Sequence, residues 1–156
     1  MKKDINIFIV GGHGGLEKFM MPILRKKYTE VSYFRNESEC LKLLDQKPNI
    51  LILNDSRRNI QLFDFLNNVK ADTKPHVIYL SRDTRIFNIL KVFKSGASDF
   101  VVKDSCTNYA VNKSIERLLE LTENFKKKVS SEYFFKSSSI QERYPRRFRF
   151  AQLMML

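Results

Sequence analysis

Three groups of residues that could bind an anion each follow a short apolar run. They are the glycines Gly11-Gly12, the hydroxyl residue Ser81 and the cationic residue Lys103. Backbone N–H groups of a glycine-rich loop, a hydroxyl and an ammonium are the donors that phosphate or sulfate prefers in proteins. If the fold brings the three groups together, the sequence predicts a small anion-binding pocket.

Asn54 and Asp55 follow another apolar run and differ in nucleophilicity and in charge. The amide of Asn54 is a poor nucleophile and carries no charge to hold a metal ion, whereas the carboxylate of Asp55 could do both. Side chains of successive residues in an extended segment point to opposite sides, so we expect Asp55 to point away from the pocket unless a bulge re-aims it. Arg57 and Arg58 in the following loop would add positive charge and possible anion contacts.

Apolar runs alternate with helical patterns along the first four-fifths of the chain. Strands separated by helices require right-handed crossovers and give a parallel sheet covered on both faces, with ligand sites beyond the carboxyl ends of the strands. The candidate pocket residues lie at those ends. The predicted strands are Ile5–Val10, Val31–Phe34, Ile50–Leu53, His76–Leu80 and Phe100–Val102.

The segments between the strands have apolar residues at helical spacing, which is typical of helices that pack on a sheet. Asn36 and Glu39 form a capping pair at the expected start of the second helix. Pro22 falls inside the first helical pattern, where it should kink the helix or shift its start. The last helix is expected to begin near Asn108 and to extend past Lys128. The stripes comprise Leu16, Phe19, Met20 and Ile23; Leu62, Phe65, Leu66 and Val69; Ile86, Ile89, Leu90 and Phe93; Val111, Ile115, Leu118 and Leu119.

A longer pattern resembles the receiver domain of bacterial response regulators, especially the chemotaxis regulators. The segment Gly96-Ala97-Ser98-Asp99-Phe100-Val101-Val102-Lys103 is similar to their last strand and the turn before it, and Pro48–Leu53 is similar to their third strand. The resemblance implies a flavodoxin-like α/β fold, a doubly wound five-stranded parallel sheet in the order 2-1-3-4-5. The resemblance covers residues 1–124, which we expect to form a receiver-like domain. Residues 125–156 lie outside it and form a basic aromatic tail.

The resemblance also shows where the family's chemistry is missing. Receivers hold Mg²⁺ with two acidic residues after the first strand and with the phosphoaccepting aspartate after the third. This sequence has Gly11, Gly12 and Asn54 there, so we expect magnesium binding to be lost or very weak and no cofactor to be bound. Ser81 and Lys103 match the positions that contact the phosphoryl group, and Phe100 matches the aromatic switch position.

The residue after Lys103 is Asp104 where receivers usually have a proline on a cis bond. A cis bond before a residue other than proline costs roughly 2.5–4 kcal/mol, so this loop should be trans and could aim Lys103 differently. The glycine-rich run Gly11–Gly15 matches neither the dinucleotide-binding fingerprint nor the Walker loop, and a flexible connection that has lost its acidic pair explains it better than a phosphate-binding loop does.

These features favour a non-enzymatic signalling module that binds a protein partner without aspartyl phosphorylation. The first alternative is a working two-component receiver that takes part in a phosphorelay and uses Asp55 as phosphoacceptor. A small-ligand or flavin binder of the same architecture is a further alternative, although no flavin-stacking motif is present.

The positive charge of the chain is concentrated in its tail. Residues 124–156 hold eight Lys and Arg against two Asp and Glu, within a total net charge of +11. Arginines alternate with aromatic residues in Tyr144–Phe150, which suits nucleic-acid contacts as well as docking on a protein or a second copy. We expect the tail to serve association rather than core stability.

No apolar run reaches the roughly 18 residues of a membrane helix, and the N-terminus does not resemble a signal peptide. Cys40 and Cys106 form no metal-ligand spacing, so we expect reduced thiols in a cytoplasmic protein.

Overall fold

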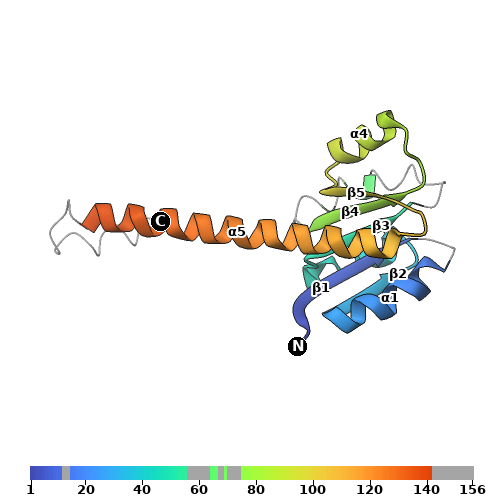
Figure 1. The fold of residues 1–156 in the computed structure, drawn as a ribbon, viewed down its shortest axis with the longest axis horizontal. Helices are drawn as coiled ribbons and strands as arrows, with labels where there is room; N and C mark the ends of the chain where they lie inside the picture. Colours follow the sequence, from blue (N-terminus) through green and yellow to red (C-terminus); the bar gives the residue numbers. More distant parts are fainter. Residues whose placement is uncertain (12–14, 56–63, 67–68, 70–74, 142–156) are drawn as a thin grey trace. The chain divides into compact units, whose positions relative to one another are not determined.

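The computed structural model of the chain describes residues 1–11, 15–55, 64–66, 69 and 75–141, except for the side chains of residues 16–17 and 130–141. Five parallel strands form one sheet in the order β2-β1-β3-β4-β5, which confirms the predicted topology (Figure 1). The strands are β1 Lys3–Val10, β2 Tyr28–Phe34, β3 Ile50–Asn54, β4 His76–Ser81 and β5 Asp99–Val102.

The strands form where the sequence is apolar and β-branched. All five residues of β3 are buried, as expected for a central strand of a parallel sheet that is covered on both faces. β2 starts three residues before its predicted start because Tyr28 and Glu30 pair with β1, and the hydroxyl of Thr29 donates to the carbonyl of Lys3 at 2.8 Å. Polar residues are tolerated there because β2 is an edge strand.

The helices follow the strands in sequence: α1 Leu16–Lys27, α2 Glu37–Leu41, α4 Ile86–Lys94 and α5 Thr107–Gln141, with a 3₁₀ turn at Leu44–Gln46. The predicted cap of α2 is confirmed: the backbone N–H of Glu39 donates to Asn36 Oδ1 at 2.9 Å, and the carboxylate of Glu39 accepts from the backbone of Arg35. Pro22 lies inside α1, which extends on both sides of it.

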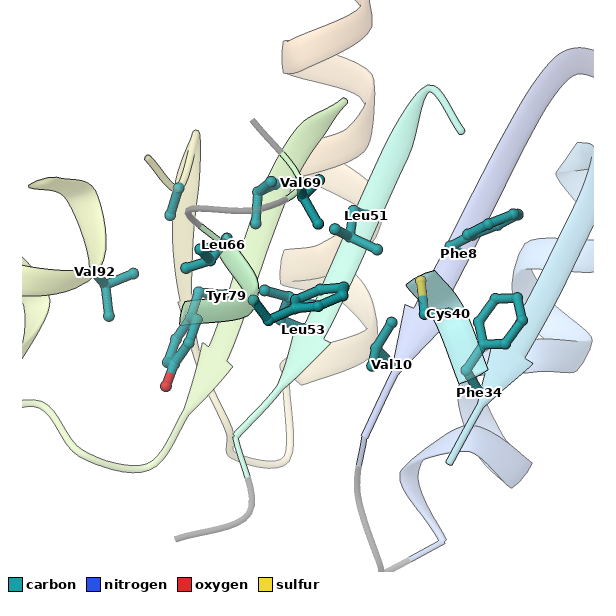
Figure 2. Close-up of a cluster of buried hydrophobic side chains, with 13 residues drawn as sticks. Phe8, Val10, Phe34, Cys40, Leu51, Leu53, Leu66, Val69, Tyr79 and Val92 are labelled. Carbon is teal, nitrogen blue, oxygen red and sulfur yellow. The ribbon is translucent and has the colours of Figure 1, made fainter. Parts of the chain in front are cut away.

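One face of the sheet packs a cluster of apolar side chains. Figure 2 shows Phe8 and Val10 of β1 beside Leu51 and Leu53 of β3, and the rings of Phe8 and Phe34 lie 4.8 Å apart. Cys40, Leu66, Val69 and Val92 also belong to this cluster. Each side chain of this size contributes roughly 1.5–3 kcal/mol when it is buried.

Alternate residues of the same strands form a second buried set. Period-two alternation places Ile7, Ile9 and Ile52 on the opposite face from Phe8. They are buried, as are Met20 and Leu24 of α1 and Val111 and Ile115 of α5. Both faces of the sheet are therefore covered.

α4 differs from the expected pattern. The apolar residues at helical spacing were expected to form its packing face, but Val92 is the buried residue and most of the stripe faces solvent. Hydrophobic periodicity identifies an apolar stripe without showing that the stripe meets its own domain.

The start of α5 is attached to β5. Ser114 and Arg117 both donate hydrogen bonds to Asp99 Oδ2, and the other carboxylate oxygen accepts from the backbone N–H of Phe100 at 2.9 Å. α5 continues to Gln141, so the prediction that this helix extends past Lys128 is confirmed.

The chain divides into two compact units, residues 1–118 and 119–156. Among the described helices, none combines the length and the apolar character needed to cross a membrane. The arginine and aromatic run Tyr144–Phe150 lies outside the described residues.

Candidate functional site

Asn54 and Lys103 meet at the carboxyl end of the sheet, as the sequence predicts. Asn54 is the last residue of β3 and is only 6% exposed. Its Oδ1 accepts a hydrogen bond from Lys103 Nζ at 2.8 Å, and its Nδ2 donates to the carbonyl of Gly11 at 3.4 Å. Lys103 also donates to the backbone carbonyl of Asp55. Both of these acceptors are neutral oxygens, and together they orient the ammonium toward the end of β3.

The peptide bond between Lys103 and Asp104 is trans. The backbone N–H of Lys103 donates to the carbonyl of Ser81 at 2.9 Å, which continues the pairing of β4 with β5 past the last strand residue. This contact fixes the start of the loop, and the long side chain still reaches Asn54.

The expectation that Asp55 points away from the pocket is wrong. Asp55 Oδ2 accepts a hydrogen bond from the hydroxyl of Ser81 at 2.7 Å. The alternation of side chains holds only within a strand, and β3 ends at Asn54, so Asp55 already belongs to the following loop. Its backbone N–H still donates to the carbonyl of Leu80 at 2.8 Å, which keeps Asp55 beside β4.

Tyr79 is a member of this site that sequence reasoning missed. Burial, and then the Asp55 carboxylate that accepts its hydrogen bond, raise the pKa of the Tyr79 phenol far above its usual value. The ring of Tyr79 stacks on Phe100 with the centroids 6.0 Å apart and 19° between the planes. The available signal was spacing, because Tyr79 precedes Ser81 by two residues and so shares its face of β4.

Gly11, the first residue after β1, adopts a backbone conformation that favours glycine. Its φ is +82°, and a Cβ at this position would lie 2.9 Å from the backbone carbonyl oxygen of Asn54. L-residues with side chains rarely adopt this φ, and the contact is closer than a Cβ tolerates. The main chains at the ends of β1 and β3 therefore approach each other closely at Gly11 and Asn54.

A second polar cluster links the pocket to α4. The hydroxyl of Ser81 accepts from the backbone N–H of Asp83 at 3.1 Å. The carboxylate of Asp83 accepts from Asn88 Nδ2 at 2.6 Å and from Arg85, which holds the pKa of Asp83 well below its usual range. Hydrogen bonds thus connect Asp55 through Ser81 and Asp83 to the first turns of α4.

The site does not fit Mg²⁺. Hard cations need several oxygen ligands and usually a carboxylate, but the carboxylate of Asp55 binds Ser81 and Tyr79. A cation on Asn54 Oδ1 would face the Lys103 ammonium, which lies 2.8 Å from that oxygen. Within the described ranges, no group of three His, Cys, Asp or Glu residues is placed to hold a metal ion.

The structure thus brings together five of the candidate residues: Gly11, Asn54, Asp55, Ser81 and Lys103. Phe100 lies next to this group, because it stacks on Tyr79, which binds Asp55. Gly12, Arg57 and Arg58 lie outside the described residues.

Solved structures with a similar fold include response regulators. The chemotaxis response regulator CheY4 of Vibrio cholerae is 16% identical, with a TM-score of 0.65 over 74% of this chain and 99% of that one. A two-component response regulator from Clostridium difficile is 16% identical, with a TM-score of 0.67 over 75% of this chain and 97% of that one. The response regulator domain of Thermotoga maritima CheB is 15% identical, with a TM-score of 0.61 over 76% and 96%.

No family model and no curated protein matches the sequence. The similarity to the solved structures is one of fold. The fold of this chain is that of a response-regulator receiver domain, a flavodoxin-like parallel α/β sheet.

Proposed function

We propose that the chain is a receiver-like signalling module that binds a partner and is not an enzyme. The arrangement of its pocket is set by contacts among its own side chains instead of by aspartyl phosphorylation. The observation that carries this proposal is that residues of the chain already engage each other at the pocket. Lys103 binds Asn54, and Ser81 binds the carboxylate of Asp55. Each retained receiver position thus has a partner within the chain.

The chemistry of the pocket supports the same conclusion. At the phosphoacceptor position the amide of Asn54 is a weak nucleophile, and its oxygen is bound to an ammonium. The nearby nucleophile Asp55 lacks the further carboxylates that would hold a metal ion, because Gly11 contributes only backbone there. Phosphoryl transfer depends largely on such charge neutralisation.

The surface that suits a protein partner is the exposed side of α4. Its apolar residues are exposed by 76% at Ile86, 77% at Phe87, 53% at Leu90 and 42% at Phe93. Ile86, Leu90 and Phe93 follow i, i+4, i+7 spacing, so they form one stripe with Phe87 beside it. Contiguous exposed apolar side chains of this kind mark interaction sites.

Basic residues lie in α4 and just before it, and one of them, Arg85, is paired with Asp83. Arg82, Arg85, Lys91 and Lys94 are all exposed. Two copies meeting through α4 would bring these charges together, whereas an apolar segment flanked by acidic residues would complement them. We therefore assign the α4 stripe to a protein partner with acidic flanks.

The phosphorylation part is tested with a small phosphodonor and Mg²⁺, followed by intact-mass measurement. The expected result is an unchanged mass. A stable phosphoryl adduct that disappears in the Asp55→Asn variant would show that Asp55 is a working phosphoacceptor and would refute the proposal.

The partner part is tested by affinity capture from the source cells, followed by reconstitution with the purified partner. Phe87→Asp should abolish the reconstituted complex, because it replaces the most exposed apolar side chain of this α4 surface with a charge. The matched control is Phe19→Asp, which adds the same charge at an exposed phenylalanine of α1 (69% exposed) and should leave binding intact. Equal loss in both variants, or in neither, would exclude α4 as the interface.

A further inference from the structure

The first turn of α4 has little apolar contact to hold it in place. The buried residue of this helix is Val92, in its second half, whereas Ile86 and Phe87 of the first turn are 76% and 77% exposed. Ile89, one turn later, is half-buried. Apolar side chains stabilise a packing arrangement only as far as they are removed from water, so those of the first turn contribute little to its position.

Asp83, which precedes α4, makes polar contacts that hold this turn. One carboxylate oxygen accepts from the backbone N–H of Arg85 at 3.1 Å, and the other accepts from Asn88 Nδ2 at 2.6 Å. The guanidinium of Arg85 binds the same carboxylate, with Nη2 2.5 Å from Oδ2. A carboxylate at the start of a helix satisfies N–H groups that have no partner within the helix, and it interacts favourably with the helix dipole.

Asp83 is itself attached to the end of β4. Its backbone N–H donates to the hydroxyl of Ser81 at 3.1 Å, and that hydroxyl donates to Asp55 Oδ2 at 2.7 Å. Ser81 is the last residue of β4 and is 2% exposed, so the attachment point is buried at the edge of the sheet. A hydroxyl that donates to a carboxylate becomes a better acceptor, so each of these two hydrogen bonds strengthens the other.

We propose that Asp83 is a positioning residue, which holds the first turn of α4, and with it Ile86 and Phe87, in the orientation that the protein partner binds. Asp83 acts through the helix rather than by contact with the partner. The hydrogen bond between Asp55 and Ser81 determines how firmly Asp83 is held, so the pocket influences binding at α4. The part of this inference that concerns the partner rests on the proposed function, whereas the effect on α4 is a property of the chain alone.

Charge alone predicts the opposite effect of Asp83 on binding. The proposed partner has acidic flanks, so the loss of an acidic residue beside α4 should strengthen the complex and release Arg85 for the partner. Positioning predicts that the same loss weakens the complex, because the partner would then have to order a loosened first turn when it binds. The direction of the change therefore distinguishes the two roles.

The first test is hydrogen exchange of the full chain without a partner. The backbone N–H groups of Asn88 and Ile89 donate to the carbonyl of Arg85 at 3.0 and 3.1 Å, so their exchange reports the opening of the first turn. Asp83→Ala should accelerate this exchange about fivefold, the size of a typical N-terminal capping contribution. Asp83→Asn keeps an acceptor for the backbone N–H of Arg85 and should give an intermediate rate.

Two further variants complete this test. Ser81→Ala removes the hydroxyl to which Asp83 is attached, so it should accelerate the same two N–H groups. The matched control is Asp45→Ala, which removes the same charge at an exposed aspartate of the 3₁₀ turn Leu44–Gln46 and should leave both rates unchanged.

The second test measures the affinity for the partner that the natural chain captures. Asp83→Ala should weaken the complex about fivefold, and Asp83→Asn should weaken it less. Asp45→Ala should leave the affinity within about twofold, because it changes the net charge equally without loosening α4.

Two results would overturn the proposal. The first is natural exchange of the Asn88 and Ile89 N–H groups in Asp83→Ala. The second is a complex that Asp83→Ala strengthens or leaves unchanged although Phe87→Asp abolishes it, which would reject the positioning role and leave the α4 interface standing. A complex that Phe87→Asp leaves intact would instead refute the α4 interface of the proposed function, and the exchange rates would then decide whether Asp83 positions α4.

Discussion

The hydrogen bond between Asp55 and Ser81 should stabilise the domain measurably. It is 2.7 Å long, and its acceptor is a carboxylate. Hydrogen bonds to charged groups contribute about 1.5–3 kcal/mol, and because Asp55 is only half-buried we expect a coupling energy of about 1–2 kcal/mol. This value is the part of the two mutational effects that depends on both residues being present.

A double-mutant cycle isolates this coupling. Unfolding free energies from urea titrations of the natural chain, Asp55→Ala, Ser81→Ala and the double variant give the non-additive term. Asp55→Ala also removes the acceptor of Tyr79, so it should be the more damaging single change. This extra loss occurs whether or not Ser81 is present, so it cancels in the cycle.

Hydrogen exchange supplies a local readout of the same contact. The backbone N–H of Asp83 donates to the hydroxyl that Asp55 orients. Asp55→Ala should therefore accelerate its exchange about tenfold if the local contribution is near 1.4 kcal/mol. The pair Ser114 and Asp99 serves as a positive control, because it joins the same residue types elsewhere in the unit. A coupling below about 0.3 kcal/mol at Asp55 and Ser81, within ordinary additivity error, would refute the reasoning.

Three further outcomes are expected. Gly11→Ala should destabilise the domain by roughly 2–4 kcal/mol through its positive φ and its contact with Asn54, whereas Gly15→Ala, with positive φ but open space, should cost about 1 kcal/mol; equal losses in chemical denaturation would contradict this. A thiol reagent should label exposed Cys106 at once and Cys40 only on unfolding, because burial raises the pKa of the Cys40 thiol to about 12; immediate labelling of both would contradict this. Burial lowers the pKa of His76, so the unfolded chain binds its proton more readily; stability should fall as the pH drops below about 6.5, and urea titrations of His76→Gln should show a smaller fall.

The sequence was sufficient to predict the positions of the strands and the residues that meet at the pocket. Apolar runs located the strands, and the rule that parallel strands end at one edge brought Asn54, Ser81 and Lys103 together. Strand order came from the resemblance to receivers, since periodicity does not determine which strands are neighbours.

The details of the site depended on geometry that residue patterns do not carry. Asp55 lies one residue beyond a strand, where alternation no longer predicts direction. The exposed stripe of α4 has the same spacing as a buried one, so the sequence could not show which side meets the sheet. The positive φ of Gly11 follows from the path of the chain after β1. The apolar pattern of β1 does not show that the next residue must adopt this φ.

The close approach of Gly11 to Asn54 has a consequence for how such a pocket can change over generations. A substitution that returned a carboxylate at position 11 would first strain the backbone and push the main chain away from Asn54. One carboxylate alone holds Mg²⁺ poorly, so selection would meet the loss of stability before any gain of metal affinity. Substitutions that add a side chain at position 11 are therefore opposed by stability before any metal site could be completed around it.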